Sequence, residues 1–539
     1  MLYLIRLDRK RFSMFIKRNI KKVGDKTYVT PLLVRSIKKK GKNPEHETIA
    51  NLSKLPEDLL KEFEKLLKGG KVRSLEDFSH DQGKFCGGLL VLYEVCKRLG
   101  IDKALGKGDK AKYALLLIIG RILAQGSRLH LVKSWSIDQA IEEVLDLKDF
   151  TEDDLYNTLT WLSENQEKLE KKLYKRRNKR ETVSDIYLYD VTSSYFEGTQ
   201  NELSEYGYNR DGKKGKKQIV IGLLCDAEGY PVSVQVFKGN TQDPKTVYEQ
   251  LKKLRAVFGV KRVVLVGDRG MIKKAEIEKI SEFEWDYITA ITKPQIETLL
   301  KAGILQLSLF DEKIMEVENE GCRYIYRKNP VRAKEISDNR ESKTASIRGL
   351  VDKKNNYLAT HPKATVPAAL KEINKKIKKL KLNSVISCEE TERKLTIKVD
   401  QEELANKSRL DGCYVIKTNG FEIPKETIHD RYKALSEVEF AFRTFKTALE
   451  EVRPIYLRKE KKTRGHVFVC MLSYMIVKYI WDKTKELGYT REFIFSTLDS
   501  IQYINFTLNN STLKLLPKNY QKHQQEILDK LEIKLPTNL

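Results

Sequence analysis

Three acidic residues lie in sequence contexts that suit a metal-binding carboxylate. Asp190 ends an alternating apolar run that begins at Ile186, and Asp268 follows the β-branched run Val263–Val266 at a glycine-flanked turn. Both runs predict β-strands, the second buried and parallel, and strand ends are where sites open in α/β sheets. The third acid, Glu439, lies in a predicted helix. Carboxylate oxygens are the ligands that Mg²⁺ and Mn²⁺ prefer, so the three acids suggest a divalent-metal site.

Helical geometry distinguishes Glu439 from the other acids of its helix, which the apolar spacing predicts to run from about Tyr432 to Glu451. At about 100° per residue, Glu439 flanks the apolar stripe, whereas Glu437 is predicted to face solvent. Tyr432 and Lys446 each lie seven residues from Glu439 and fall on the same line. A phenol, a carboxylate and an ammonium in one line can meet a phosphate backbone and a metal together.

The chain resembles the DDE transposases of prokaryotic insertion sequences. The motifs that carry the resemblance are Tyr189-Asp190-Val191-Thr192-Ser193, Val266-Gly267-Asp268-Arg269-Gly270, Tyr432-(6)-Glu439-(6)-Lys446, Arg453-Pro454-Ile455-Tyr456 and Gly465-His466-Val467. They occur in the family's order, with a long insert before the helix motif. The related helix motif carries an arginine three residues after the tyrosine, where this chain has Leu435. Arg431, Arg443 or another residue would then supply one phosphate contact.

This resemblance implies that Asp190, Asp268 and Glu439 are the catalytic residues and hold two Mg²⁺ or Mn²⁺ ions, with Asp190 bridging the pair. In such sites the ions lie about 3.5–4 Å apart, and they activate the attacking oxygen and stabilise the leaving oxygen. The implied DNA contacts are Tyr432, Lys446, Arg443 and Arg269.

The expected function is a transposase that binds inverted terminal repeats, cleaves DNA and transfers the 3′ ends to target DNA, by cut-and-paste and with hairpin ends as a plausible route. Holding two ends together predicts a homodimer on DNA. Two alternatives stay open: a ribonuclease H-like nuclease or resolvase without strand transfer, and an inactive DNA-binding derivative.

Each acid also has an ordinary structural interpretation when taken alone. Asp190 at a strand end could bond the backbone of the residues that follow it. Asp268 could be a turn residue before Arg269-Gly270. Glu439 could pair with Arg443 one helical turn away. Their joint occurrence in order and on one helix face favours catalysis.

The elements that must position these residues indicate an α/β fold with a ribonuclease H-like mixed sheet. The order β-β-β-α-β-α-β over 181–294 places the first strand beside the fourth, and with it Asp190 beside Asp268. The predicted units are a small basic β/α module with DNA contacts at 1–75, a helical DNA-end-binding domain at 76–180, the first part of the catalytic domain at 181–294, an inserted, mostly β subdomain at 295–420, the second part of the catalytic domain at 421–500 and a C-terminal helical tail at 501–539.

Composition agrees with a polyanionic partner. The 539 residues carry a net charge of +26 with a pI near 9.4, an excess that favours binding to DNA. The basic run Gly212–Lys217 lacks the order of a P-loop and is interpreted as a DNA-contacting loop or a solvated one. Seven cysteines without a C-x-x-C pair indicate reduced thiols and no zinc site. The apolar stretches are too short to span a bilayer, so we expect a cytoplasmic protein. The resemblance implies that it is prokaryotic and lies on the nucleoid when bound.

Overall fold

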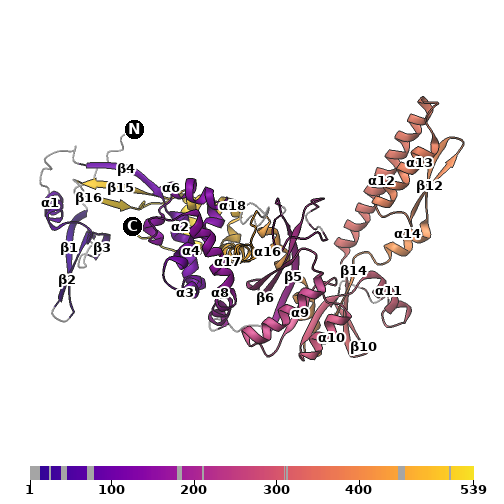
Figure 1. The fold of residues 1–539 in the computed structure, drawn as a ribbon, viewed down its shortest axis with the longest axis horizontal. Helices are drawn as coiled ribbons and strands as arrows, with labels where there is room; N and C mark the ends of the chain where they lie inside the picture. Colours follow the sequence, from indigo (N-terminus) through magenta and orange to yellow (C-terminus); the bar gives the residue numbers. More distant parts are fainter. Residues whose placement is uncertain are drawn as a thin grey trace.

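The computed structural model describes residues 12–23, 26–37, 45–68, 78–178, 185–198, 200–208, 210, 212–306, 308, 310, 313–446, 456–508 and 511–539. The molecule is elongated (Figure 1). A small sheet of N-terminal strands lies at one end, a helical arm lies at the other, and a helical region and a large sheet lie between them. The candidate residues belong to this middle part.

The large sheet has eight strands in the order β10-β11-β14-β9-β8-β5-β6-β7. The strands are β5 (Ile186–Tyr195), β6 (Gln218–Asp226), β7 (Pro231–Lys238), β8 (Val264–Gly267), β9 (Asp286–Ala290), β10 (Met315–Asn319), β11 (Cys322–Lys328) and β14 (Cys413–Thr418). β5 pairs in parallel with β8, and β8 with β9, while the remaining neighbours are antiparallel. The expected placement of the first strand of this region beside its fourth is therefore confirmed.

Helices cover both faces of the sheet because its strands alternate apolar side chains between two cores. Tyr187 and Tyr189 of β5 pack with α9 (Asp243–Lys253) and α10 (Lys274–Glu282). The intervening residues Ile186 and Leu188 belong to the other core, together with residues of α16 (Leu435–Phe445) and α17 (Glu460–Thr484). By the same alternation, Asp190 lies on the face that α16 covers.

The helical region is built around α17, whose residues from Gly465 to Lys478 are all buried although the chain reaches this helix only after the sheet. Ser473 on α17 donates to the Ile118 carbonyl of α4, and Gly465 lies so close to Leu159 of α8 that an added Cβ would be 1.9 Å from the Leu159 carbonyl oxygen. The surrounding helices are α2 (Gly87–Leu99), α3 (Ile101–Leu105), α4 (Asp109–Leu123), α5 (Arg128–His130), α6 (Ser136–Asp138), α7 (Ile141–Leu145), α8 (Glu152–Asn178), α18 (Arg491–Asp499) and α19 (Lys522–Leu531). The helical region and the sheet thus share one continuous core.

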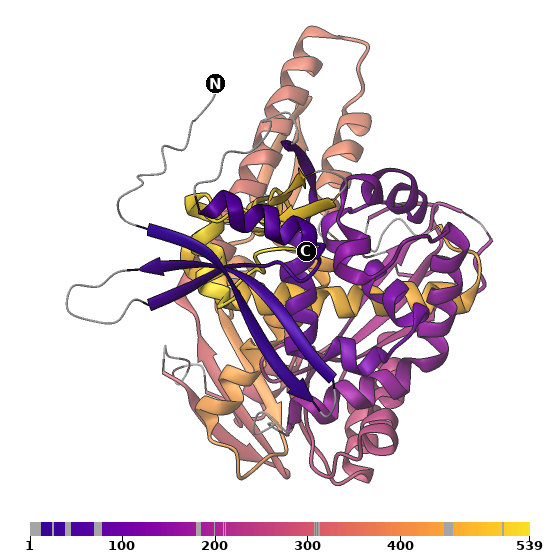
Figure 2. The ribbon, with the colours of Figure 1, turned by 90° about the vertical axis from the view of Figure 1, so that its left-hand side faces the viewer.

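Two small sheets lie beyond the helical region. The first consists of β1 (Phe12–Val23), β2 (Lys26–Ile37) and β3 (Glu45–Asn51), with α1 (Glu57–Leu67) beside it (Figure 2). In the second, β15 (Gln502–Leu508) pairs with both β16 (Ser511–Leu515) and β4 (Phe78–Phe85). The segment from 501, expected to be a helical tail, therefore has two strands before its helix, because β4 offers them a pairing edge.

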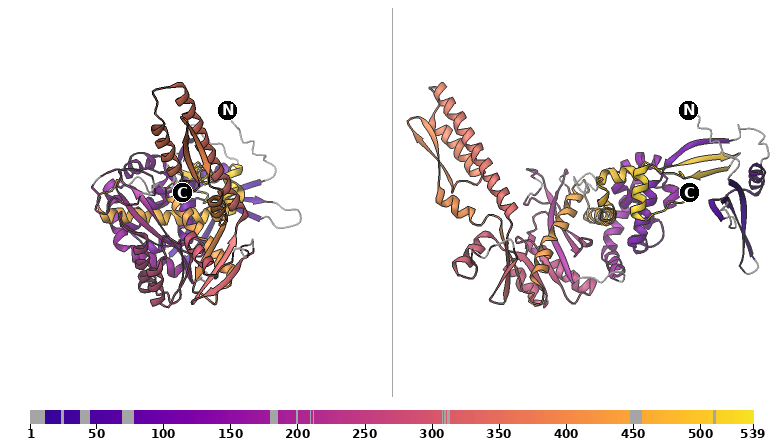
Figure 3. Two further views of the ribbon diagram at one scale, coloured as in Figure 1. Left: turned by 90° about the vertical axis from the view of Figure 1, so that its right-hand side faces the viewer. Right: turned by 180° about the vertical axis from the view of Figure 1, so that it is seen from behind.

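The arm emerges from the sheet between β11 and β14 and projects away from it (Figure 3). It contains α12 (Pro330–Thr360), α13 (Val366–Lys379), the hairpin of β12 (Ile386–Thr391) and β13 (Lys394–Val399), and α14 (Gln401–Ser408). The expectation of a mostly β insertion is wrong. Ile373 and Ile377 of α13 pack on Ile347 and Val351 of α12 at helical spacing, and only one hairpin completes this core.

Among the described residues, no single helix is both long and apolar enough to cross a membrane, although α4 and the segment Arg128–Asp138 meet that criterion as a pair bent by 100°.

Candidate active site

Two of the candidate acids lie side by side on the sheet. In the parallel pairing of β5 with β8, Tyr189 lies opposite Gly267, so the next residues are Asp190 and Asp268. Their strands differ in length, because β8 ends at Gly267 while β5 continues to Tyr195 along β6. The sequence predicted Asp190 at the end of its strand. Asp190 instead lies inside β5, at the level where the neighbouring strand β8 ends. Because β8 ends at Gly267, Asp268 beyond it is exposed, whereas Asp190 is half-buried.

The third acid, Glu439, comes from α16, the helix that covers this face of the sheet. Val438 and Phe442 of α16 are 0% and 5% exposed and anchor the helix in the core shared with β5. Glu439 follows Val438 and is exposed. The expected single helix is interrupted: α15 (Lys425–Lys433) ends before α16 begins, and the Glu437 amide donates to the Ala434 carbonyl only three residues back. The end predicted at Glu451 lies outside the described residues.

A single pocket brings the predicted residues together. It has a volume of about 390 Å³ and is lined by Asp190, Asp268, Glu439, Arg443, Lys446, Arg210, Asp243, Val191, Thr192, Met271 and Phe442. Four of these side chains are acidic and three are basic. Three acids that are far apart in the chain therefore share one concave surface with cations at its rim, which is an arrangement suited to metal ions and phosphate.

Asp243 and Arg210 were not predicted from the sequence. Asp243 begins α9, and the Arg210 guanidinium donates to both of its carboxylate oxygens at 2.5 Å. The Arg210 amide also donates to the hydroxyl of Ser193 on β5 at 3.3 Å. Because the two residues come from a loop and a helix start without a regular pattern, only the tertiary structure reveals them. Asp243 is therefore a neighbour of the site, and its negative charge is already balanced by Arg210.

The electrostatics of Asp190 differ from those of an ordinary surface aspartate. Burial raises its pKa to about 7, although the Val191 amide donates to its Oδ1 at 2.7 Å, and the negative charges of Asp268 and Glu439 raise it further. An ionised Asp190 is therefore unfavourable beside its acidic neighbours unless a cation compensates for it. An ionised form that is disfavoured in this way is typical of carboxylates that share a bound metal.

The donor chemistry fits hard divalent cations, because every acidic group around the pocket offers carboxylate oxygens. Within the described part of the chain, however, no three Asp, Glu, His or Cys side chains lie close enough to hold an ion as they stand. A rearrangement would therefore be needed before Asp190, Asp268 and Glu439 could hold one ion together.

Tyr432 lies beside the acids although a helix break separates it from Glu439. Burial raises the pKa of its phenol to about 12, with the charges of Asp268 and Glu439 adding to this and Arg269 opposing it. Tyr432 thus lies within electrostatic range of both acids and Arg269. Arg443 and Lys446 line the pocket itself. Leu435, which replaces the arginine of the related motif, is 9% exposed and packs in the core.

The prediction that Glu437 faces solvent holds in part: its side chain is 42% exposed, but its carboxylate also pairs with a buried lysine. Lys478 on α17, whose side chain is 5% exposed, lies 3.1 Å from the Glu437 carboxylate and 3.3 Å from that of Asp482. On the other side, an added Cβ at Gly229 would come within 2.7 Å of the Glu437 Cβ, and Gly229 has a φ of +81°. Glu437 therefore lies between α17 and the β6–β7 turn, and its ion pair with Lys478 ties α16 to α17.

His466 and Trp285 are both buried and have polar partners inside the protein. His466 is 3% exposed within α17, and its Nδ1 lies 2.6 Å from the Arg128 guanidinium. Trp285 is 3% exposed and donates its indole N–H to the Lys261 carbonyl at 2.9 Å. All seven cysteines are free.

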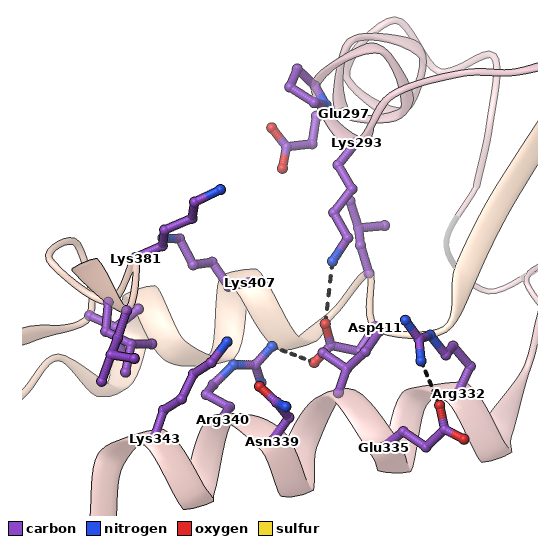
Figure 4. Close-up of a pocket in the computed structure, with 16 residues that line it drawn as sticks. Lys293, Glu297, Arg332, Glu335, Asn339, Arg340, Lys343, Lys381, Lys407 and Asp411 are labelled. Carbon is purple, nitrogen blue, oxygen red and sulfur yellow. Dashed lines mark hydrogen bonds and ion pairs between the residues drawn. The ribbon is translucent and has the colours of Figure 1, made fainter. Parts of the chain in front are cut away.

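A second pocket, of about 570 Å³, lies at the root of the arm (Figure 4). Asp411 is buried there and binds Lys293 at 3.3 Å and Arg340 at 2.6 Å, which joins α11 (Lys293–Lys301) to α12. Arg332 and Glu335 form an exposed ion pair nearby. Six of the side chains that line this pocket are basic and three are acidic, and the ion pairs of Asp411 connect the arm to the sheet.

A family model described as "Transposase DDE domain" matches residues 181–476, which is more than half of the chain and includes Asp190, Asp268 and Glu439. No curated protein matches the chain. Among solved structures, the chain is similar to a piggyBac transposase synaptic complex with hairpin DNA, with 10% sequence identity, coverage of 76% of each chain and a TM-score of 0.36.

Proposed function

Because the chain belongs to the transposase DDE domain family, we propose that it is a DNA transposase of a prokaryotic insertion sequence. In this proposal it binds the inverted terminal repeats, cleaves DNA phosphodiesters and transfers the 3′ ends to target DNA. The sheet from β5 to β9 acts as a ribonuclease H-like catalytic core. The observation that carries the proposal is the gathering of Asp190, Asp268 and Glu439 around one pocket that also holds basic side chains.

Asp190, Asp268 and Glu439 would hold two Mg²⁺ or Mn²⁺ ions. The ions supply activation of the attacking oxygen and charge stabilisation of the leaving oxygen. Asp190 must lose its proton before it can serve as a ligand, so its raised pKa links metal binding to proton release. The chain needs no side-chain nucleophile, because water and then a 3′-hydroxyl attack the phosphodiester.

Cationic and phenolic groups around the pocket would position the DNA. Arg443 and Lys446 lie at its rim, where they can neutralise phosphate charge, and Arg269 and Tyr432 lie on the side of Asp268. Lysine acts there as a point charge, while arginine can bind phosphate through two N–H groups. A homodimer would hold two transposon ends at once.

The test is cleavage of a labelled duplex that carries the element's terminal repeat, with Mg²⁺, by wild type and by Asp190→Asn. We expect end cleavage by the wild type, strand transfer when the end is supplied already cut, and loss of both reactions in the variant with DNA binding retained. Hairpin ends would appear on denaturing gels as self-complementary products that are themselves cut slowly. Cleavage without strand transfer would identify a nuclease instead. Equal behaviour of wild type and Asp190→Asn would remove the carboxylates from the mechanism.

A further inference from the structure

Three strongly exposed tyrosines lie around the loop that joins β5 to β6. Tyr206 is 64% exposed, Tyr208 is 81% exposed and Tyr456 is 72% exposed. Isolated apolar side chains on a surface are common and need no explanation. Exposed aromatic rings that gather around one loop, however, are a feature of surfaces that bind a partner.

The backbone beneath Tyr206 and Tyr208 is held in place. Glu205 exchanges two backbone hydrogen bonds with Gln218 at the start of β6, at 3.1 and 3.0 Å. The buried Gln218 side chain donates to the Tyr208 carbonyl at 3.0 Å and to the Gly239 carbonyl at 2.9 Å. The two rings are thus displayed from an anchored segment, which lowers the entropy that binding would cost.

Gly207, between the two tyrosines, explains how the segment fits against the sheet. A Cβ at this position would lie 2.0 Å from the Gly239 carbonyl oxygen. Only a residue without a side chain allows the segment to approach the end of β7 so closely. This close backbone contact therefore holds the segment that carries the two solvent-exposed rings.

Basic side chains alternate with these rings. Arg210 lies 5.5 Å from the Tyr208 ring, Lys217 lies 5.8 Å from the Tyr206 ring and Lys213 lies 5.7 Å from the Tyr195 ring. These distances are in the range of cation–π contacts. The basic run predicted as a DNA-contacting or solvated loop is therefore mixed with aromatic rings, and this mixture is typical of surfaces that bind unpaired nucleotides.

The same loop reaches the candidate active site. Arg210, which lies against Tyr208, also lines the pocket of Asp190, Asp268 and Glu439 and binds Asp243. A strand whose phosphate lies among the acids would therefore have its neighbouring nucleotides close to Tyr208. A fully paired duplex keeps its bases stacked on one another and cannot offer them to these rings.

We propose that Tyr206 and Tyr208, with the basic residues beside them, form a platform on which unpaired DNA bases next to the scissile phosphate stack. This inference rests on the proposed transposase function and adds a substrate feature to it: strand separation at the DNA end. The platform is sequence-tolerant, because every base offers an aromatic face. Its anchoring favours a ligand that docks onto rings already in place.

The test measures binding in EDTA, so that no cleavage occurs. The probes are a short fluorescein-labelled oligodeoxythymidine and a blunt duplex of equal length. For the double variant Tyr206→Leu/Tyr208→Leu we expect single-strand affinity to fall roughly 5- to 150-fold, which corresponds to the about 1–3 kcal/mol of one stacked base. Duplex affinity should change little. The double Phe variant should bind both probes like wild type, because it keeps the rings.

Controls separate this inference from the proposed catalysis. Tyr357→Leu removes a ring that is 52% exposed on the arm and should leave single-strand affinity unchanged. Asp190→Asn, expected to be inactive, should still bind the oligodeoxythymidine. A 2-aminopurine placed in the single strand should be quenched by wild type and not by the Leu variant. Unchanged single-strand affinity in the Leu variant would overturn the platform. So would an equal loss of affinity for both probes, or a loss of affinity in the Phe variant equal to that in the Leu variant.

Discussion

Asp190 and Asp268 occupy equivalent levels on parallel neighbouring strands, because the residue before each one, Tyr189 and Gly267, forms the last register pair of β5 with β8. Alternation along the strands directs both towards the face that α16 covers. These two neighbouring carboxylates repel one another when both are ionised, and the repulsion contributes to the raised pKa of Asp190. The proposed metal ions would offset this repulsion.

Metal binding should depend on pH through Asp190. Its pKa of about 7 means that a metal ion must displace a proton below neutrality, so Mn²⁺ affinity should fall by up to about tenfold per pH unit below pH 7. Calorimetry at pH 8 and pH 6 in two buffers of different ionisation enthalpy would show the released proton. A pH-independent affinity would contradict the assignment of Asp190 as a ligand.

The stability of the metal-free protein should respond in a defined direction. The pKa of Asp190 is higher in the folded state than its ordinary value of 3.8, so the folded state binds the proton more tightly. Its contribution to stability is present at low pH and is lost as pH rises from about 4 to about 7. Asp190→Asn should therefore have a higher Tm than wild type at pH 8, and the difference should shrink towards pH 4. A lower Tm for the variant at pH 8 would contradict this sign.

Glu439 and Glu437 provide a matched pair on one helix. Glu439→Gln should reduce Mg²⁺-dependent cleavage by a factor of at least about 100, because it removes a charge needed at the transition state. Glu437→Gln keeps a hydrogen-bonding group near Lys478, so it should retain most of the activity and lower stability modestly. Cleavage rates and Tm values of both variants check this. Loss of activity in Glu437→Gln alone would place the wrong face of α16 at the site.

Periodicity in the sequence was sufficient for the strands that carry Asp190 and Asp268. Their apolar alternation and β-branched run predicted β5 and β8, and chain order predicted that the two would be neighbours. The same reasoning placed Val438 and Phe442 in the core, because their spacing matches one helix face. Local patterns determine these features, so one sequence is enough to find them.

Contacts between distant segments were beyond the sequence. Glu437 keeps part of the exposure expected from its position on its own helix, but its contacts with Lys478 of α17 and with Gly229 of the β6–β7 turn come from distant segments. The mostly β expectation for the arm came from the family resemblance, and α12 is polar along most of its length, so little apolar periodicity marks it as a long helix. Asp243 and Arg210 enter the site through loop geometry, which leaves no periodic signal.

Gly229 should be sensitive to substitution for two separable reasons. Gly229→Ala introduces a side chain at positive φ, which costs about 1–2 kcal/mol, and also forces a Cβ against Glu437. Gly259→Ala carries the first cost alone, since φ is +68° there and nothing lies within 4 Å. We expect both variants to lose stability in urea unfolding, and only Gly229→Ala to lose cleavage activity, because it displaces α16. Equal activity in the two would show that α16 tolerates the shift.

The rim cations should contribute to the salt dependence of DNA binding. Each phosphate contact adds about 0.9 to the slope of log K against log salt concentration, so Lys446→Gln and Arg443→Gln should each reduce the slope by about that amount. Lys433→Gln changes an exposed lysine that does not line the pocket and should leave the slope unchanged. Titrations of a labelled terminal-repeat duplex at several salt concentrations measure it. An unchanged slope in both rim variants would remove these residues from the DNA path.

The attachment of the arm should depend on Asp411 far more than on the neighbouring surface ion pair. The Asp411 side chain is 7% exposed and binds Arg340, which is 17% exposed, so Asp411→Ala leaves a largely buried guanidinium without its carboxylate and should cost about 3 kcal/mol. Glu335→Ala breaks a pair whose members are 66% and 55% exposed and should change stability by less than about 1 kcal/mol. Urea unfolding and hydrogen exchange in α12 measure both effects. We expect faster hydrogen exchange in α12 in Asp411→Ala only. The arm has a core of its own, so loss of this carboxylate loosens it at its root. Equal protection in the two variants would mean that the helical packing of the arm, and not this carboxylate, fixes it to the sheet.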